Sequence, residues 1–228
     1  MNITYYGHAC LGIQIDDINL VVDPFISGNP LDAAKAVDID AIKADYILIT
    51  HAHGDHIADT ERIADNNPEV VIVSNAEIAG HYAAKGYQTH PMNHGGSWQF
   101  DFGKVKYTPA IHSSSFPDGS YGGQPGGFVI ESKNKNVYIA GDTSLTMDMK
   151  LIPMFTALDL AVLPIGSNFT MDIDEAVVAS DFVKCDKVLG YHFDTFGYIE
   201  IDQEEAKRKF FEKGKDLMLL TIGESLTL

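Results

Sequence analysis

The 228-residue sequence has few cysteines and no long hydrophobic run. Cys10 and Cys185 are too few for a disulfide framework and too far apart along the chain to suggest a metal-binding pair. We therefore expect two small buried thiols in a reducing compartment. No segment approaches the ~20 apolar residues of a membrane span, and the N-terminus lacks the basic and apolar regions of a secretory signal. The expected location is the cytoplasm.

Basic side chains are also scarce, and this decides which partners we expect. The 16 Lys and Arg residues stand against 32 Asp and Glu residues, which gives a formal net charge of -16 at pH 7. A field of this sign repels phosphate backbones and anionic lipids. We therefore expect a small-molecule substrate, and neither nucleic acid nor a membrane as a partner. The oligomeric state stays open, with a homo-oligomer as one alternative.

Short apolar runs alternate with turn signals and helix-length polar segments, as is typical of α/β proteins. The expected strands cover residues 3–6, 11–15, 19–22, 45–49, 70–73, 99–102, 104–109, 128–131, 137–140, 160–163 and 187–191. The expected helices cover residues 55–66, 75–85, 147–155, 173–184 and 202–213. Asp172 followed by Glu175 predicts a capping box at the start of the helix over 173–184.

A segment rich in glycine and proline, residues 113–127, divides the chain in half and predicts no regular element. It lacks the Lys-Ser/Thr ending of a phosphate-binding loop and does not open a helix, so we exclude a phosphate cradle. As a loop beside His112 it is expected to shape a pocket, with Tyr121 as a candidate contact. Each half looks like strands followed by αβ units, and one two-layered domain over residues 1–228 explains this better than two independent domains.

Three histidines and one carboxylate occur within the six residues His51-Ala52-His53-Gly54-Asp55-His56, which follow Thr50 and the apolar run that ends at Ile49. Imidazoles and carboxylates satisfy borderline divalent ions such as zinc, manganese or iron, and they rarely crowd together without a cation to share. A chance match to this pattern is expected in roughly one in a thousand chains of such composition. A metal site is therefore favoured over a polar surface loop.

Three more polar residues, His112, Asp142 and His192, each directly follow an apolar run. In α/β sheets the side chains at the carboxyl ends of strands converge at one edge, where ligands bind. Taken alone, each of the three would be interpreted as a turn residue with local hydrogen bonds. Together with the four polar residues of the motif, they make the seven groups that a two-metal site requires.

The seven side chains are expected to divide between two divalent ions. Residues two apart on extended backbone point the same way, whereas adjacent residues at a turn diverge. The first ion is therefore expected to bind His51, His53 and His112. The second is expected to bind Asp55, His56 and His192. Asp142 has two carboxylate oxygens and is the expected bridge between ions ~3.5 to 4 Å apart. Zinc is the first choice, with manganese, nickel or iron as alternatives.

The sequence resembles the metallo-β-lactamase superfamily, whose His-x-His-x-Asp-His loop occurs here at residues 51–56. Further stretches that carry the resemblance span nearly the whole chain and cover residues 6–10, 22–25, 140–143, 163–171 and 191–196. More narrowly, the chain is similar to small bacterial and archaeal metal-dependent hydrolases related to the ascorbate-6-phosphate lactonase-like branch. The resemblance implies a four-layer αβ/βα sandwich with a dinuclear metal site at one edge of the sheets, the same seven ligands, and hydrolysis.

The expected reaction is hydrolysis in which a metal-bridging hydroxide attacks an ester-type bond, as in a phosphodiester, lactone or thioester. The substrate would be a small metabolite, which can be anionic. Catalytic roles are assigned to Asp55, which orients the nucleophile or shuttles its proton, and to Asp142, which holds the ions at bridging distance.

Further residues are candidates for the surroundings of the metals. His8 matches the N-terminal Gly-His pair of the family and is interpreted either as a substrate contact or as a turn histidine bonded to backbone. Asp23 either orients a ligand histidine or caps the turn before Pro24. Asn168 and Thr170 lie at another strand exit and are candidate pocket residues.

Three other functions are alternatives at this point. The same fold can hold iron in an oxidoreductase; diiron relatives carry Glu where this chain has His53, but persulfide dioxygenases with a single iron keep the histidine. An amidohydrolase also has His-x-His after a strand, although its barrel is generally longer than 228 residues. A non-catalytic metal-binding protein is the third alternative, and the presence of every expected ligand argues against it.

Overall fold

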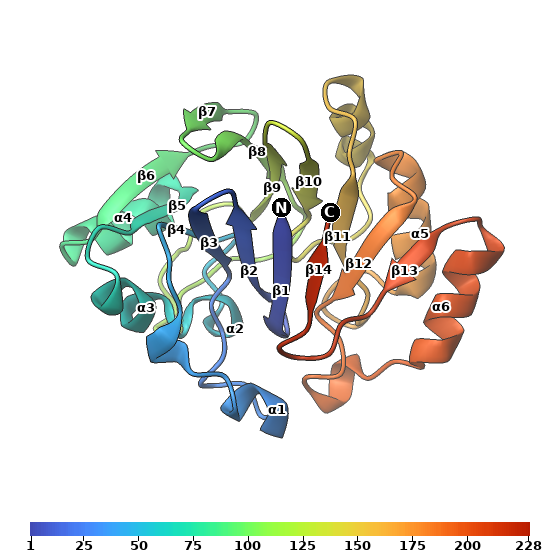
Figure 1. The fold of residues 1–228 in the computed structure, drawn as a ribbon, viewed down its shortest axis with the longest axis horizontal. Coiled ribbons are helices and arrows are strands. Elements are labelled where there is room, and N and C mark those ends of the chain that lie inside the picture. The colour runs from blue at the N-terminus through green and yellow to red at the C-terminus, as the bar shows by residue number, and fades with distance from the viewer.

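The computed structural model describes residues 1–228 as two stacked seven-stranded sheets with helices on their outer faces (Figure 1). The first sheet has the order β14-β1-β2-β3-β4-β5-β6. Its strands are β1 (Asn2–Gly7), β2 (Cys10–Ile15), β3 (Ile18–Val22), β4 (Tyr46–Leu48), β5 (Val71–Asn75), β6 (Gln88–Met92) and β14 (Ser225–Thr227). The strands β3 to β6 pair in parallel, and the others pair antiparallel.

The second sheet has the order β13-β12-β11-β10-β9-β8-β7. Its strands are β7 (Ser97–Phe100), β8 (Gly103–Pro109), β9 (Gly126–Glu131), β10 (Asn136–Ile139), β11 (Leu160–Pro164), β12 (Lys187–Tyr191) and β13 (Asp216–Met218). The strands β10 to β13 are parallel and β7 to β10 are antiparallel, so each sheet has a parallel and an antiparallel half. The two termini meet in the first sheet, where β14 pairs with β1 (Figure 1).

The helices are short and lie outside the sheets. They are α1 (Asp32–Lys35), α2 (Gly54–Ile57), α3 (Thr60–Asn66), α4 (Ala76–Ala84), α5 (Ile173–Phe182) and α6 (Gln203–Glu212). Short 3₁₀ helices cover Ile39–Ala41, Met147–Met154 and Gly197–Ile199. No helix combines the length and apolar character needed to cross a bilayer.

Three buried clusters show how the layers pack. The central cluster joins residues of both sheets, such as Leu11 and Leu48 of the first and Val105 and Val162 of the second. One outer cluster packs the second sheet against α5 and α6, and the other packs the first sheet against α3 and α4. Because alternate side chains of a strand point to opposite faces, each sheet contributes to two of these clusters. The predicted four-layer αβ/βα sandwich is confirmed.

Most expected elements are present, and the capping box is confirmed: Asp172 accepts a hydrogen bond from the Glu175 amide at 2.8 Å, and the Glu175 carboxylate accepts one from the Asp172 amide. The helix expected over 55–66 is wrong in one respect, because it is broken into α2 and α3. The break occurs at Asp59, whose backbone amide donates to the Pro24 carbonyl at 3.0 Å and not to a carbonyl of the preceding turn.

Two other expectations need correction. The segment 147–155 forms a 3₁₀ helix, which contains Pro153, a residue that cannot donate a helical hydrogen bond. The glycine-rich segment 113–127, expected to hold no regular element, includes the first two residues of β9, Gly126 and Gly127, and it joins β8 to β9 within one sheet. The chain passes from one sheet to the other between β6 and β7 instead.

Candidate metal centre

The loops that carry the expected ligands all follow strands and meet at one edge of the sandwich. The motif 51–56 follows β4, His112 follows β8, Asp142 follows β10 and His192 follows β12. Backbone hydrogen bonds tie these loops together: the Ser144 amide donates to the Ile111 carbonyl at 3.1 Å, and the His192 amide donates to the His8 carbonyl at 2.8 Å. The convergence predicted from the strand ends is therefore present.

The first group consists of His51, His53 and His112. Each offers one ring nitrogen, and the three nitrogens all lie within 4.8 Å of one another. Nε2 of His51 lies 3.0 Å from Nδ1 of His53, and the ring of His112 is centred 5.1 Å from that of His51. His51 is buried, while His53 and His112 are partly exposed. These are the three residues predicted to share the first ion.

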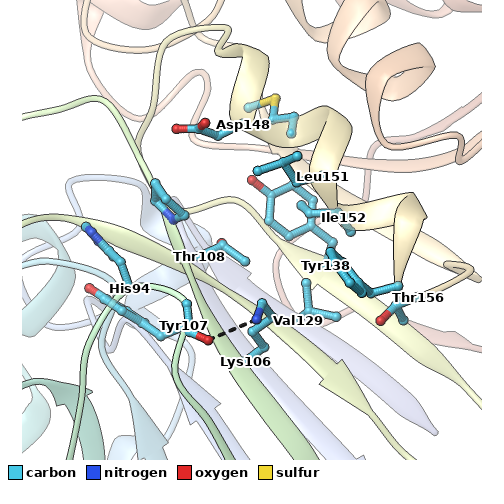
Figure 2. A pocket seen from close by; sticks show the side chains of 14 residues that line it. His94, Lys106, Tyr107, Thr108, Val129, Tyr138, Asp148, Leu151, Ile152 and Thr156 are labelled. Carbon is cyan, nitrogen blue, oxygen red and sulfur yellow. Dashed lines mark hydrogen bonds between the residues drawn. The ribbon is translucent and has the colours of Figure 1, made fainter.

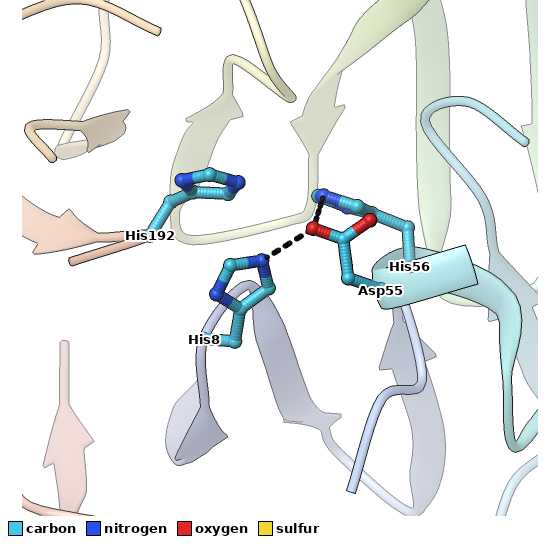
Figure 3. A group of neighbouring side chains, drawn as sticks. All are labelled: His8, Asp55, His56 and His192. Carbon is cyan, nitrogen blue, oxygen red and sulfur yellow. Dashed lines mark hydrogen bonds and ion pairs between the residues drawn. The ribbon is translucent and has the colours of Figure 1, made fainter. Parts of the chain in front are cut away.

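The second group consists of Asp55, His56, His192 and, in addition, His8 (Figure 3). Asp55 and His56 lie in α2, while His8 lies in the turn between β1 and β2. Nε2 of His8 is 3.0 Å from Oδ2 of Asp55, and Nδ1 of His8 is 3.0 Å from the Thr195 hydroxyl. The ring of His8 therefore bonds to side chains and not to the backbone, and one of them belongs to the second predicted ligand group.

Asp142 lies between the two groups. Its Oδ2 atom is 2.9 Å from Nε2 of His192 and 3.4 Å from Nε2 of His56, and also 3.6 Å from Nε2 of His112 and 3.9 Å from Nε2 of His51. One carboxylate thus faces two histidines of each group, which is the position predicted for the bridge. Gly141 allows the approach: its φ is +67°, and a Cβ there would lie 2.6 Å from the Gly126 carbonyl oxygen.

The residues present fit a divalent metal. Several buried polar atoms have no partner with hydrogen-bond geometry, namely Nε2 of His56 and both ring nitrogens of His192 in the second group, and Oδ1 of Asp142. An unpartnered buried polar atom costs about 1–3 kcal/mol, so four at one place call for a common explanation. Imidazole nitrogens and carboxylate oxygens that face one another are satisfied together by a shared cation.

Burial and the neighbouring charges set the ionisation of these groups. Burial lowers the pKa of His51, and burial with His192 nearby lowers the pKa of His8 to about 4, so both are neutral at pH 7. Burial opposes ionisation of Asp142, but His192 and His56 outweigh it and hold the Asp142 pKa well below its usual range. Burial opposes protonation of His56, but the Asp142 and Asp23 carboxylates outweigh it and raise the His56 pKa well above its usual value, so a metal ion that binds His56 would have to displace a proton.

Asp23 supports the site from behind. It is fully buried and accepts hydrogen bonds from the Thr50 amide at 2.8 Å and the Thr50 hydroxyl at 2.7 Å, and its Oδ2 lies 2.8 Å from Nδ1 of His56. The contact with Nδ1 leaves Nε2 of His56 directed towards Asp142. Of the two roles considered for Asp23, the geometry matches the one in which it orients a histidine.

A cavity of about 370 Å³ opens onto both groups. It is lined by His53, Asp55, His112, Ser113, Asp142, Phe169, His192 and Phe196. Tyr121, Asn168 and Thr170, which the sequence suggested as contacts, do not line it; the Tyr121 hydroxyl instead accepts a hydrogen bond from Gln124. Phe169, which does line it, lies between two of these candidates in the sequence, and a single apolar side chain after a strand gives no local signal that it faces a pocket.

A second cavity, of about 350 Å³, lies on β8, β9 and β10 beneath the 3₁₀ helix Met147–Met154 (Figure 2). It is mainly apolar, includes Val129, Leu151 and Ile152, and shares no lining residue with the first cavity. His94 lies at its edge, where its Nε2 contacts the Pro125 carbonyl oxygen at 2.9 Å. No group of three metal-binding side chains lies there.

Comparison with known proteins agrees with the fold and the site. The family model described as "Beta-lactamase superfamily domain" matches residues 18–193. A Flavobacterium johnsoniae protein described as a UPF0173 metal-dependent hydrolase is 69% identical over 228 residues, and a Christiangramia forsetii protein of the same description is 70% identical over 228 residues. Each comparison covers 100% of both chains.

A solved structure has a similar fold over the whole chain. Igni18, described as a novel metallo hydrolase from the archaeon Ignicoccus hospitalis, is 33% identical and superposes with a TM-score of 0.88, covering 100% of this chain and 97% of that one. The two stacked sheets exclude the barrel of an amidohydrolase, and the relatives favour hydrolysis over redox chemistry. With its fold, its histidine and aspartate groups and these relatives in agreement, the chain belongs to the UPF0173 family of metal-dependent hydrolases in the metallo-β-lactamase superfamily.

Proposed function

We propose that this hydrolase works with two divalent ions, zinc first and manganese, nickel or iron as alternatives, and cleaves an ester-type bond of a small molecule. The observation that carries the proposal is the position of Asp142, whose Oδ2 faces two histidines of each group within 4 Å. A carboxylate shared by two sets of ligands is typical of dinuclear hydrolytic sites.

The two groups would divide the ions between them. One ion would be held by His51, His53 and His112, the other by Asp55, His56 and His192, with Asp142 shared. When bound, such ions lower the pKa of water towards neutrality and polarise a carbonyl or phosphoryl oxygen. The five imidazoles favour zinc-like or manganese-like ions over the carboxylate-rich sets that suit iron.

Asp55 is the side chain placed to handle a proton. It lines the cavity, and its side chain is 30% exposed. Burial opposes its ionisation, but the hydrogen bond with His8 prevails and keeps the Asp55 pKa below its usual value, so it is ionised at neutral pH. His8 contacts Oδ2 and leaves Oδ1 without a hydrogen bond. We assign Oδ1 to accept a proton from the attacking water.

In the overall reaction, the water oxygen forms a bond to the acyl carbon or phosphorus. The bond to the leaving oxygen or sulfur breaks, and the leaving group departs with a proton. Phosphodiesters, lactones and thioesters can all be hydrolysed by this sequence of bond formation and cleavage. A cytoplasmic location completes the proposal and is supported by Cys10 and Cys185, which are buried free thiols.

Metal analysis of the purified protein, followed by a chromogenic panel of these esters with each candidate metal, tests the proposal. We expect two ions per chain and turnover of at least one ester class. A histidine outside the site provides a control. His90→Ala should keep the metal content and the activity of the wild type, because His90 packs on Trp98 and belongs to neither group. A protein that binds one ion at most, or that is fully loaded and inert on every ester class, would contradict it.

A further inference from the structure

No basic side chain lines the cavity at the metal centre. Its walls consist of metal-site residues together with Ser113, Phe169 and Phe196. Both arginines of the chain are engaged elsewhere: Arg62 pairs with Asp40 at 2.8 Å, and Arg208 pairs with Glu205 at 2.6 Å. Recognition of a phosphate monoester or a carboxylate away from the reacting bond commonly uses a Lys or Arg donor. This cavity offers none.

Two phenylalanines supply the apolar part of the cavity wall. Phe169 follows β11 and is 51% exposed, and its ring lies 6.2 Å from that of Tyr198 in an edge-to-face arrangement. Phe196 follows β12 and is partly buried, with its ring centre 5.3 Å from that of His8. Large exposed aromatic side chains beside a polar centre bind apolar groups of ligands.

The loop that presents Phe169 is held in an unusual shape. Ser167 and Asn168 have φ angles of +63° and +55°, a region that residues other than glycine rarely adopt. The Ser167 amide closes the loop by donating to the Met171 carbonyl at 3.0 Å. The Met171 amide donates to the Thr143 carbonyl at 3.0 Å, which fixes the loop to the residue after Asp142.

The loop that presents Phe196 is fixed as well. The Asp194 carboxylate accepts a hydrogen bond from the Ile201 amide at 2.8 Å, and the Ile199 amide donates to the Phe196 carbonyl at 2.9 Å. Thr195 contacts Nδ1 of His8 at 3.0 Å. The Phe169 loop is therefore tied to the Asp142 loop through its backbone, and the Phe196 loop is tied to His8 through the Thr195 side chain. Fixed positions for both rings favour a recognition surface over two chance exposures.

We infer that Phe169 and Phe196 select substrates that carry an aromatic or bulky apolar group next to the bond to be hydrolysed and no anionic group apart from the reacting centre. The inference rests on the proposed function and narrows its substrate class to esters, lactones, thioesters or phosphodiesters that have an apolar substituent and no charge outside the reacting group. Phosphate monoesters and sugar-phosphate lactones fall outside this class, because their extra charge would meet no cationic side chain.

The test compares two substrates that share the same type of scissile bond and the same leaving group. p-Nitrophenyl butyrate and the p-nitrophenyl monoester of succinic acid have acyl groups of similar size and differ in a terminal carboxylate; because that carboxylate also attacks its own aryl ester, the rate without protein is subtracted. Assays with the metal-loaded protein in about 1 M NaCl reduce the Debye length to about 3 Å, so the net charge of the protein contributes little. We expect kcat/KM for the butyrate ester to exceed that for the succinate ester by about tenfold or more.

Substitutions at Phe169 and Phe196 test whether these two side chains cause the preference for the butyrate ester. We expect Phe169→Ala and Phe196→Ala to raise KM for the butyrate ester by about fivefold to tenfold at unchanged metal content. Phe169→Lys places a cation at the wall and is expected to shift the ratio of kcat/KM values towards the succinate ester by about tenfold. Phe211→Ala is the matched control, because Phe211 is 80% exposed on α6, outside the cavity.

A binding measurement separates failure of this inference from failure of the proposed function. Calorimetry with the corresponding anilides, which have the same acyl groups, is expected to show tighter binding of the uncharged compound and loss of that preference in Phe169→Lys. Equal or better binding and turnover of the succinate compound, or a ratio unaffected by either phenylalanine, would overturn the inference while leaving hydrolysis intact. Absence of turnover on all esters would refute the proposed function, and the anilides would still decide the inference.

Discussion

Substitution of Asp23 by asparagine tests the support of the metal centre most sharply. Asp23 Oδ2 lies 2.8 Å from Nδ1 of His56 and accepts the Thr50 hydroxyl, while Oδ1 accepts the Thr50 amide. In Asp23→Asn the oxygen can keep the bond to the Thr50 amide, but the amide nitrogen then faces Nδ1 of His56. Two donors cannot pair, so His56 must carry its proton on Nε2, the atom that faces Asp142.

The magnitude follows from the contacts that are lost. A hydrogen bond to a buried carboxylate contributes about 1.5–3 kcal/mol, so the metal-free variant should unfold with a free energy lower by about that amount. Loss of a carboxylate that orients a ligand histidine lowers metal affinity by about 10- to 100-fold. The loss of metal affinity is expected here because His56 would carry its proton on Nε2, the nitrogen that would bind the ion.

Urea denaturation of the metal-free protein measures the first effect, and competition with a chromogenic chelator measures the second. Asp59→Asn is the matched control: Asp59 is also buried and accepts hydrogen bonds from two amides, those of Ile26 and Ser27, but it belongs to neither metal group. It should lose stability and keep its metal affinity. A folded Asp23→Asn variant with the metal affinity of the wild type would refute the role assigned to Asp23 and His56.

Three further predictions concern other parts of the chain. His8→Ala should keep its metal content but lose kcat by about 10- to 100-fold, since His8 positions Asp55 at 3.0 Å; elemental analysis and steady-state kinetics check this. Asp172→Ala removes the capping box of α5 and should lower the unfolding free energy by about 1 kcal/mol at unchanged metal affinity, measured by urea titration. Removal of metal by a chelator should lower the melting temperature, since metal held at 100 times its Kd stabilises the folded state by about 2.7 kcal/mol, as calorimetry can show.

Most strands that lead to the ligands could be predicted because they are buried on both faces and read as short apolar runs, as in Lys187–Tyr191, where every residue after Lys187 is buried. The strands missed by the sequence, β6, β13 and β14, all lie at sheet edges. Edge strands pair on one side only, so they can be short or contain a residue such as Pro91, and neither leaves a clear pattern.

The site also combines residues that local sequence predicts with a contact that it does not predict. His51, His53 and Asp55 belong to one short motif, and Asp142 is marked by its place after an apolar run, so local sequence predicts where they lie. The contact of His8 with Asp55 joins residues 47 positions apart. It depends on how the turn after β1 packs on α2, a tertiary arrangement that no local pattern contains.

Metal content of the Asp142→Ala variant tests the central claim most directly. Asp142 lies within 4 Å of histidines from both groups, so its removal should affect both ions at once. Elemental analysis of purified, folded protein should give two ions per chain for the wild type and a clear loss for Asp142→Ala, with His51→Ala as a second variant. Full metal occupancy in either variant would contradict the assignment of these side chains to a shared metal centre.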